Sequence, residues 1–251
     1  MSWDVNLYNE KHGFVHKYGA DLIELLDPKK GECILDLGCG SGQLTDKISS
    51  FAEQVIGIDS SKEMIVSSKK LFPDIKFYHM DAQSFEFEQS FDAIFSNAVL
   101  HWVKDQKIAS KNVFKHLKVG GRLVVEFGGY GNVATIIEAL KSSLLDHQFL
   151  KNAKLERWYF PKISTYASLL EEIGFEVVYA QLYDRPTLLE SKEAGIKDWI
   201  EMFGSHFFDG IENEDKNTIL NEVQNKVKAS CFKDGNWFAD YRRIRVVAHK
   251  K

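Results

Sequence analysis

Short apolar runs alternate with stretches of helical spacing over the first 150 residues of the chain. The apolar runs that we expect to form strands are 33–38, 54–59, 75–81, 91–97 and 120–128. The stretches whose apolar residues recur at helical spacing are 42–52, 61–72, 107–117 and 133–150. Because strands alternate with helices, we expect a mostly parallel sheet that is covered on both faces.

The pattern changes after residue 150. A helix is expected over 165–173, ended by Gly174, and it is followed by a strand over 175–183. Residues 186–230 then have mostly helical spacing, and the chain closes with a β-type run. These elements predict a doubly wound α/β fold, with a mostly parallel seven-stranded sheet and a helical cap inserted before the last strand.

The stretch ILDLGCGSGQLT joins the first strand to the first helix through a glycine-rich turn. Glycines at GxGxG spacing allow a sharp turn and a close approach of the backbone to a ligand. The turn departs from the dinucleotide-binding pattern GxGxxG, because Gln43 stands where that pattern has its third glycine. Asp36 precedes the first glycine by two residues, where its charge would repel a pyrophosphate and attract a cation.

Five motifs occur in order over residues 30–128: LDLGCGSGQ, VIGIDSS, MDAQSF, FDAIFSNAVLHWV and LKVGGRLVVEF. The set resembles the ordered motifs of the class I S-adenosylmethionine-dependent methyltransferases. The resemblance implies a Rossmann-like fold, S-adenosyl-L-methionine as cofactor with S-adenosyl-L-homocysteine as its product, and a single methyltransferase domain over 1–251. Within that domain it implies N-terminal lid helices over 1–30 and a cofactor-binding core over 31–150.

The resemblance also implies roles for residues at the strand ends. Asp59 matches the carboxylate that accepts both ribose hydroxyls, and Asp81 matches the one that accepts from the adenine amino group. Asp36 and Gly38 match positions at the methionine end. The full set expected at the cofactor is Asp36, Gly38, Cys39, Gly40, Gly42, Gln43, Asp59, Ser60, Met64, Asp81, Ala82 and Asn97. Plainer roles stay open, because an Asp after a strand is often a helix N-cap and Met64 would also fit a hydrophobic core.

The methyl acceptor is indicated by a narrower resemblance. SNAVLHWV, and the opening WDVNLY with Phe14 and Val15, resemble the trans-aconitate methyltransferase group, which methylates carboxylates. The fourth strand ends in SNAV, which lacks the prolines of the [DNS]PP[YF] signature of amine methylation on nucleobases and glutamine. A carboxylate is ionised at neutral pH, so in-line transfer to it needs no general base.

We therefore expect O-methylation of a small carboxylic acid. Three alternatives stay open: a carbon, nitrogen or lipid acceptor on the same fold, a nicotinamide-dependent oxidoreductase, and a non-catalytic cofactor-binding protein.

His101 and Trp102 follow the fourth strand, where cofactor and acceptor are expected to meet. His101 is the catalytic candidate, as a residue that positions the acceptor rather than a base, and in protonated form it could pair with an acid. Trp102 could line the substrate site or pack beneath the sheet. Further aromatic candidates for the substrate site are Trp3, Tyr8, Phe14 and Phe203, and the candidates for pairing with a carboxylate are Arg157, Arg185, Arg242 and Arg243.

Composition excludes some partners. The 251-residue chain has a net charge of −4, which argues against nucleic acid as a partner. Its three cysteines have no metal-ligand spacing, so neither a metal site nor a disulfide framework is expected. No apolar run approaches the ~18 residues of a membrane span and the first residues lack a signal pattern, so a cytoplasmic location is expected. A monomer and a dimer are equally consistent with the sequence.

Overall fold

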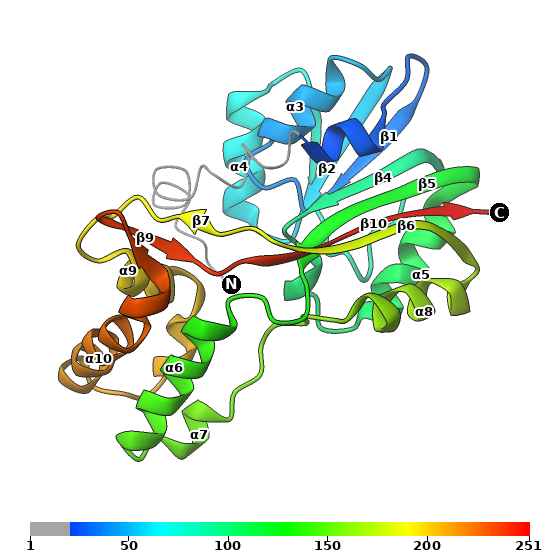
Figure 1. The fold of residues 1–251 in the computed structure, drawn as a ribbon. Helices are drawn as coiled ribbons and strands as arrows, with labels where there is room; N and C mark the ends of the chain where they lie inside the picture. Colours follow the sequence, from blue (N-terminus) through cyan, green and yellow to red (C-terminus); the bar gives the residue numbers. More distant parts are fainter. Residues whose placement is uncertain (1–20) are drawn as a thin grey trace. The chain divides into compact units, whose positions relative to one another are not determined.

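The computed structural model describes residues 21–251, and a seven-stranded sheet dominates them (Figure 1). Its strand order is β3-β2-β1-β4-β5-β10-β6. The strands are β1 (Cys33–Leu37), β2 (Gln54–Asp59), β3 (Lys76–His79), β4 (Phe91–Asn97), β5 (Leu117–Gly128), β6 (Phe175–Asp184) and β10 (Arg242–Lys250). The pairs from β3 to β5 are parallel, whereas β10 runs antiparallel to β5. The predicted mostly parallel, Rossmann-like α/β sheet is therefore confirmed.

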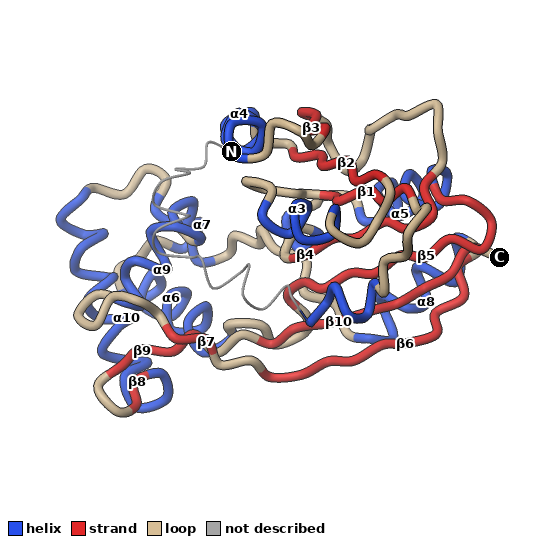
Figure 2. The backbone as a smooth tube through the Cα atoms, turned by 90° about the horizontal axis from the view of Figure 1, so that it is seen from above, coloured by secondary structure: helices blue, strands red, loops and turns tan. Residues whose placement is uncertain are grey.

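Helices cover both faces of this sheet, because alternate residues of each strand point to opposite sides. On one face, Leu35 and Leu37 of β1 join a hydrophobic cluster with α5 (Gln106–His116) and α8 (Ile163–Ile173). On the other face, Ile34 packs with α3 (Gln43–Ser49) and with the helical residues 21–26. Figure 2 looks down on the strands lying side by side between these helices.

The chain forms two compact units, and the sheet belongs to the first. The first unit contains the described residues up to Tyr130 together with Trp158–Tyr183 and Arg243–Lys251. The second contains Gly131–Arg157 and Asp184–Arg242. The expected cap over residues 186–230 falls within the second unit, which also takes in the segment that follows β5.

The second unit is mainly helical. Its helices are α6 (Ala134–Asp146), α7 (Leu150–Ala153), α9 (Gly195–Phe203), the 3-10 turn η2 (Ser205–Phe208) and α10 (Asn213–Cys231). The helical spacing expected over residues 186–230 is found in α10, whose buried side chains include Ile219, Val223 and Val227. A small sheet of β7 (Thr187–Leu188), β9 (Asn236–Ala239) and β8 (Phe232–Lys233), in that order, was not predicted.

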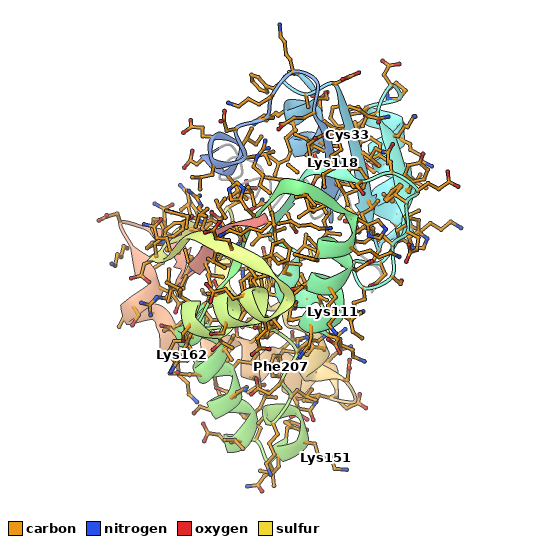
Figure 3. All side chains as sticks on the ribbon, turned by 90° about the vertical axis from the view of Figure 1, so that its right-hand side faces the viewer. Cys33, Lys111, Lys118, Lys151, Lys162 and Phe207 are labelled. Atoms are coloured by element: carbon orange, nitrogen blue, oxygen red, sulfur yellow. The ribbon has the colours of Figure 1, made fainter. Side chains whose placement is uncertain are left out.

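The amino-terminal ends of the parallel strands are fastened by Asp92, at the start of β4. Its carboxylate accepts a hydrogen bond from the Cys33 backbone N–H at 2.8 Å and pairs with the Lys118 ammonium at 2.8 Å. Figure 3 labels Cys33 and Lys118, which lie close together. The opposite, carboxyl ends of the strands are where ligands bind in sheets of this kind. None of the described helices is long and apolar enough to span a membrane.

Candidate cofactor and acceptor site

Two glycines of the turn after β1 have different surroundings. Gly38 has φ +79, and a Cβ added there would lie 2.2 Å from a methyl carbon of Val99. Gly40 has φ +55, and a Cβ added there would meet nothing within 4 Å. Gly38 therefore lets the turn pack against the loop that follows β4, whereas Gly40 borders open space within the described structure. An open, backbone-lined turn of this kind can hold a ligand closely.

Asp59, the last residue of β2, faces this turn. Its carboxylate accepts hydrogen bonds from the backbone N–H groups of Gly40 at 3.0 Å and Ser61 at 2.8 Å. Burial raises the pKa of the Asp59 carboxyl, although these two hydrogen bonds oppose the rise. A carboxylate offers about four acceptor positions, so a pair of ribose hydroxyls still finds acceptors here. The residue that caps α4 (Lys62–Leu71) is Ser61, whose hydroxyl accepts from Met64 N–H at 3.2 Å.

Asp36 is buried in the interior of β1, on the face covered by α3. One carboxylate oxygen accepts a 2.6 Å hydrogen bond from the Thr45 hydroxyl. Burial raises the pKa of Asp36 to about 7, and the neighbouring Asp59 charge adds to the rise. Burial disfavours the ionised form of this carboxyl, and a cation bound next to it would stabilise that form. This chemistry fits the positive sulfonium and ammonium groups of S-adenosylmethionine.

Asp81 follows β3 and is held in a tight turn. Its Oδ1 accepts from the Gln83 backbone N–H at 2.7 Å, and its carbonyl accepts from the N–H groups of Ser84 and Phe85. The side chain is exposed, and Ala82 beside it is buried. The hydrogen bonds of the turn engage Oδ1 of the carboxylate, so Oδ2 can accept from an amino group. The glycine turn, Asp59, Asp36 and Asp81 thus fit the groups of S-adenosylmethionine.

The loop after β4 carries His101 to the edge of this site. Ala98 has φ +62, an uncommon left-handed conformation for a residue with a side chain, and it turns the chain sharply into η1 (Leu100–Trp102). The Nδ1 atom of His101 accepts from the Gly128 backbone N–H at 3.4 Å. In a neutral ring with Nδ1 as the acceptor, the proton resides on Nε2, which is then a donor.

The surroundings of His101 in the structure disfavour its protonation at neutral pH, and its pairing with an acid in protonated form stays a prediction. Burial, together with the nearby Arg243 charge, lowers the pKa of His101 well below its ordinary value of 6.5. The ring is therefore neutral at pH 7. The physical reason is that an imidazolium would lose its hydration and lie beside another cation.

Of the four candidate arginines, Arg243 is the one that belongs to the first unit. It is buried in β10, where it pairs across the sheet with Gly128, whose N–H contacts His101. Arg157, Arg185 and Arg242 all belong to the second unit, where the Arg242 guanidinium lies 3.2 Å from the Asp184 carboxylate. Within the first unit, Arg243 is thus the candidate that the fold brings to His101.

Two aromatic residues next to His101 were not predicted. Trp158 and Phe160 lie in the segment that enters the first unit before α8, and the Tyr159 backbone N–H between them donates to the His101 carbonyl at 3.0 Å. The Trp158 ring lies 5.8 Å from the Trp102 ring, and the Phe160 ring lies 5.9 Å from the His101 ring. Their only sequence signal is an aromatic-rich stretch, WYF, without helical or strand periodicity.

The remaining candidates lie in several environments. Cys39 packs with Ile65 and Phe77, Met64 is buried, and Gln43 accepts from the Ser41 hydroxyl. Ser60 is exposed and its carbonyl contacts the His79 ring, and Asn97 ends β4 beside Glu126 of β5.

Phe203 belongs to the second unit, where its ring lies 5.4 Å from that of Trp199. Trp3, Tyr8 and Phe14 lie outside the described residues, and all these roles stay predictions.

Known proteins share both the sequence and the fold. The model of the methyltransferase domain family matches residues 35–125. An uncharacterized methyltransferase of Schizosaccharomyces pombe is 35% identical, covering 99% of this chain and 98% of the relative. The trans-aconitate 2-methyltransferase of Klebsiella pneumoniae is 26% identical, covering 99% and 98%. The structure of an S-adenosylmethionine-dependent methyltransferase from Mesorhizobium loti superposes with a TM-score of 0.56 at 19% identity, covering 92% of this chain and 96% of that one. The chain therefore belongs to the class I S-adenosylmethionine-dependent methyltransferases.

Proposed function

We propose that this methyltransferase methylates the carboxylate of a small organic acid. The observation that carries the proposal is the pair formed by His101 and Arg243 next to the glycine turn. Val99 contacts the turn at Gly38, and His101 follows Val99 by two residues, so the pair adjoins the methionine end of the expected cofactor site. A neutral N–H donor beside a guanidinium is a suitable receptor for an anion.

The same pair is poorly suited to general-base catalysis. The Nδ1 atom of His101 already accepts from Gly128 N–H, and the low pKa of the ring makes it a weak proton acceptor. A carboxylate has a pKa of about 4 and needs no proton removed. Its oxygen forms the new O–C bond while the C–S bond breaks and leaves its electron pair on sulfur, so no proton moves. The pair is left with the tasks of orienting one carboxylate oxygen and excluding water.

A cationic or amine acceptor is disfavoured by charge. Arg243 remains protonated in proteins, and its field already lowers the pKa of His101. An ammonium acceptor would experience the same repulsion. The trans-aconitate methyltransferase that this chain resembles over almost its whole length is named for an acid, which supports the proposal.

The test is chemical identification of the transferred methyl group. The enzyme is incubated with methyl-labelled S-adenosylmethionine and a panel of carboxylic acids and matched amines, and the product is treated with mild base. A methyl ester releases labelled methanol, whereas a methyl group on nitrogen or carbon is retained. Label retained in every product, or turnover only with amines, would contradict the proposal.

Two variants of His101 separate positioning from base catalysis. His101→Gln keeps an N–H donor near the same place and is expected to retain more activity than His101→Leu, which removes the donor. We expect the loss in His101→Leu to be on the order of ten- to a hundredfold in kcat/KM, the range of one lost hydrogen bond to a charged group. His147→Gln, in the second unit, is the matched control and is expected to leave kcat/KM within about twofold of wild type.

A further inference from the structure

A buried ion pair and a tyrosine hydroxyl join the last three strands in the order of the sheet. Glu126 of β5 lies directly opposite Arg245 of the antiparallel strand β10, and its side chain is 1% exposed. The Arg245 Nε donates to the Glu126 Oε2 at 2.8 Å, and the Tyr183 hydroxyl of β6 donates to the same oxygen at 2.7 Å. Arg245 also donates to the Tyr183 oxygen at 3.0 Å. We call these three residues the three-strand network, and Figure 1 shows β10 between β5 and β6.

The three-strand network lies near the carboxyl end of β5, where the backbone of this strand contacts the loop that carries His101. The Glu126 carbonyl accepts from the Ala98 N–H at 2.7 Å, at the left-handed turn that leads into η1. Two residues further along β5, the Gly128 N–H donates to Nδ1 of His101 at 3.4 Å. The end of β5 therefore holds both the start of this loop and its imidazole.

The same network bears on the position of Arg243. Side chains two residues apart on a strand lie on the same face, so Arg243 and Arg245 share one face of β10. The pairing of Arg245 with Glu126 goes together with the pairing of Arg243 with Gly128. A slip of β10 by one residue would turn both arginines to the other face of the sheet. Because a buried charge without its partner is costly, the ion pair opposes such a slip.

We infer that Glu126 is a positioning residue for methyl transfer, which acts by fixing the end of β5 and, through it, His101 and Arg243. The effect on the reaction rests on the function proposed above for His101 and Arg243, whereas the effect on the loop does not. Methyl transfer depends on the alignment of the two reactants, so a loosened loop should slow it. The cofactor residues on β1 and β2 are not part of the network, so cofactor affinity should change little.

The first experiment measures hydrogen exchange at single backbone amides by NMR in wild type and in Glu126→Gln, which removes the charge and keeps the shape of the side chain. We expect the amides of Ala98 and Gly128 to exchange about tenfold faster or more in the variant. The reference is the amide of Gly38, which donates to the Ile58 carbonyl at 2.7 Å and should change less than about threefold. A variant that has only lost global stability would show faster exchange at all three amides.

The matched control is Glu32→Gln, because Glu32 forms an ion pair with Arg122 of the same strand β5, at 2.7 Å. It should leave exchange at Ala98 and Gly128 within about twofold of the rate at the Gly38 reference, both relative to wild type. Tyr183→Phe is a milder variant that removes one hydroxyl and keeps the ion pair of the network, so it tests the inference even if Glu126→Gln does not fold. We expect it to speed exchange at the same two amides by about threefold.

The second experiment measures methyl transfer and cofactor binding in the same variants. The acceptor probes are trans-aconitate, benzoate and decanoate, and kcat/KM is compared for the one that turns over fastest. We expect Glu126→Gln to lower kcat/KM by about tenfold or more and to leave the Kd for S-adenosylhomocysteine within about threefold of wild type. Arg245→Lys keeps a cation near Glu126 and should retain more of kcat/KM than Arg245→Gln.

Each outcome supports or overturns a stated part of the inference. Faster exchange confined to Ala98 and Gly128, together with lower kcat/KM and an unchanged Kd, would support it. Exchange that is unchanged there, or faster by the same factor at Gly38, would overturn it, as would faster exchange with wild-type kcat/KM. If none of the three acids accepts a methyl group while exchange changes as expected, the proposed carboxylate acceptor fails and the fixing of the loop by Glu126 stands.

Discussion

Replacing Asp36 by Asn should change how the stability of the protein depends on pH. The pKa of Asp36 rises from an ordinary 3.8 to about 7 in the folded protein because the carboxyl is buried. A raised pKa means that the folded state is destabilised as the group ionises, so the contribution is favourable below pH 3.8 and is lost as the pH rises through about 7. Three pKa units at about 1.4 kcal/mol each amount to about 4 kcal/mol of unfolding free energy.

The measurement is urea unfolding of wild type and Asp36→Asn between pH 5 and pH 8.5. Asparagine keeps an oxygen to accept from the Thr45 hydroxyl, but its buried amide introduces a penalty of about 1–3 kcal/mol that is the same at every pH. The informative quantity is therefore the pH slope of the difference between the two proteins. We expect the variant to gain up to about 3 kcal/mol relative to wild type across this range. Asp46→Asn, at an exposed position in α3, is the control variant.

Two outcomes would refute this reasoning about Asp36. Parallel pH profiles for wild type and Asp36→Asn would mean that the carboxyl does not titrate abnormally in the folded state. Unchanged affinity of the variant for S-adenosylmethionine would mean that Asp36 does not attract the cationic end of the cofactor. If both expectations hold, cofactor binding should also release protons near pH 7, which titration calorimetry in buffers of different ionisation enthalpy measures.

Two further substitutions probe the cofactor turn. Gly40→Ala should preserve the free energy of unfolding within roughly 1 kcal/mol, because the new methyl group meets open space, yet weaken S-adenosylmethionine binding by tenfold or more. Gly38→Ala should instead unfold at clearly lower urea concentration, because its methyl group would overlap Val99. The reverse ranking of the two stabilities would contradict the geometry. Asp59→Asn should raise the Kd for S-adenosylhomocysteine by about tenfold or more in calorimetry, because one amide oxygen cannot accept from Gly40, Ser61 and two hydroxyls; an unchanged Kd would remove Asp59 from the ribose site.

The sequence was sufficient to predict the sheet and to predict that the ligand site lies at the carboxyl ends of its strands. Strand and helix periods differ, so alternation between them is visible in one sequence, and the strand ends carry Asp59 and Asp81 directly in the pattern. The glycine turn was also visible, because glycines at GxGxG spacing follow the first strand directly. The structure added the separate reasons for two of its glycines, contact with Val99 in one case and open space in the other.

The acceptor side could not be assembled from the sequence. Choosing Arg243 among four arginines requires knowing that β10 runs antiparallel to β5 and pairs Arg243 with Gly128, and register between distant strands has no local signal. Trp158 and Phe160 reach His101 through a long-range return of the chain that carries no periodicity. Ala98 gives no hint of its left-handed backbone, since alanine has no preference for that conformation. The short strands of the second sheet are likewise too brief for a periodic pattern.

The central claim is that the methyl acceptor is a carboxylate that is already ionised and needs no base. The most direct test is the pH dependence of kcat between pH 6 and pH 9, with S-adenosylmethionine and the preferred acid both saturating. Because His101 stays neutral and the acceptor stays ionised over this range, we predict a rate that is constant within about twofold. A rate that rises tenfold per pH unit over part of this range, as proton removal from an amine or hydroxyl acceptor would require, would contradict the account.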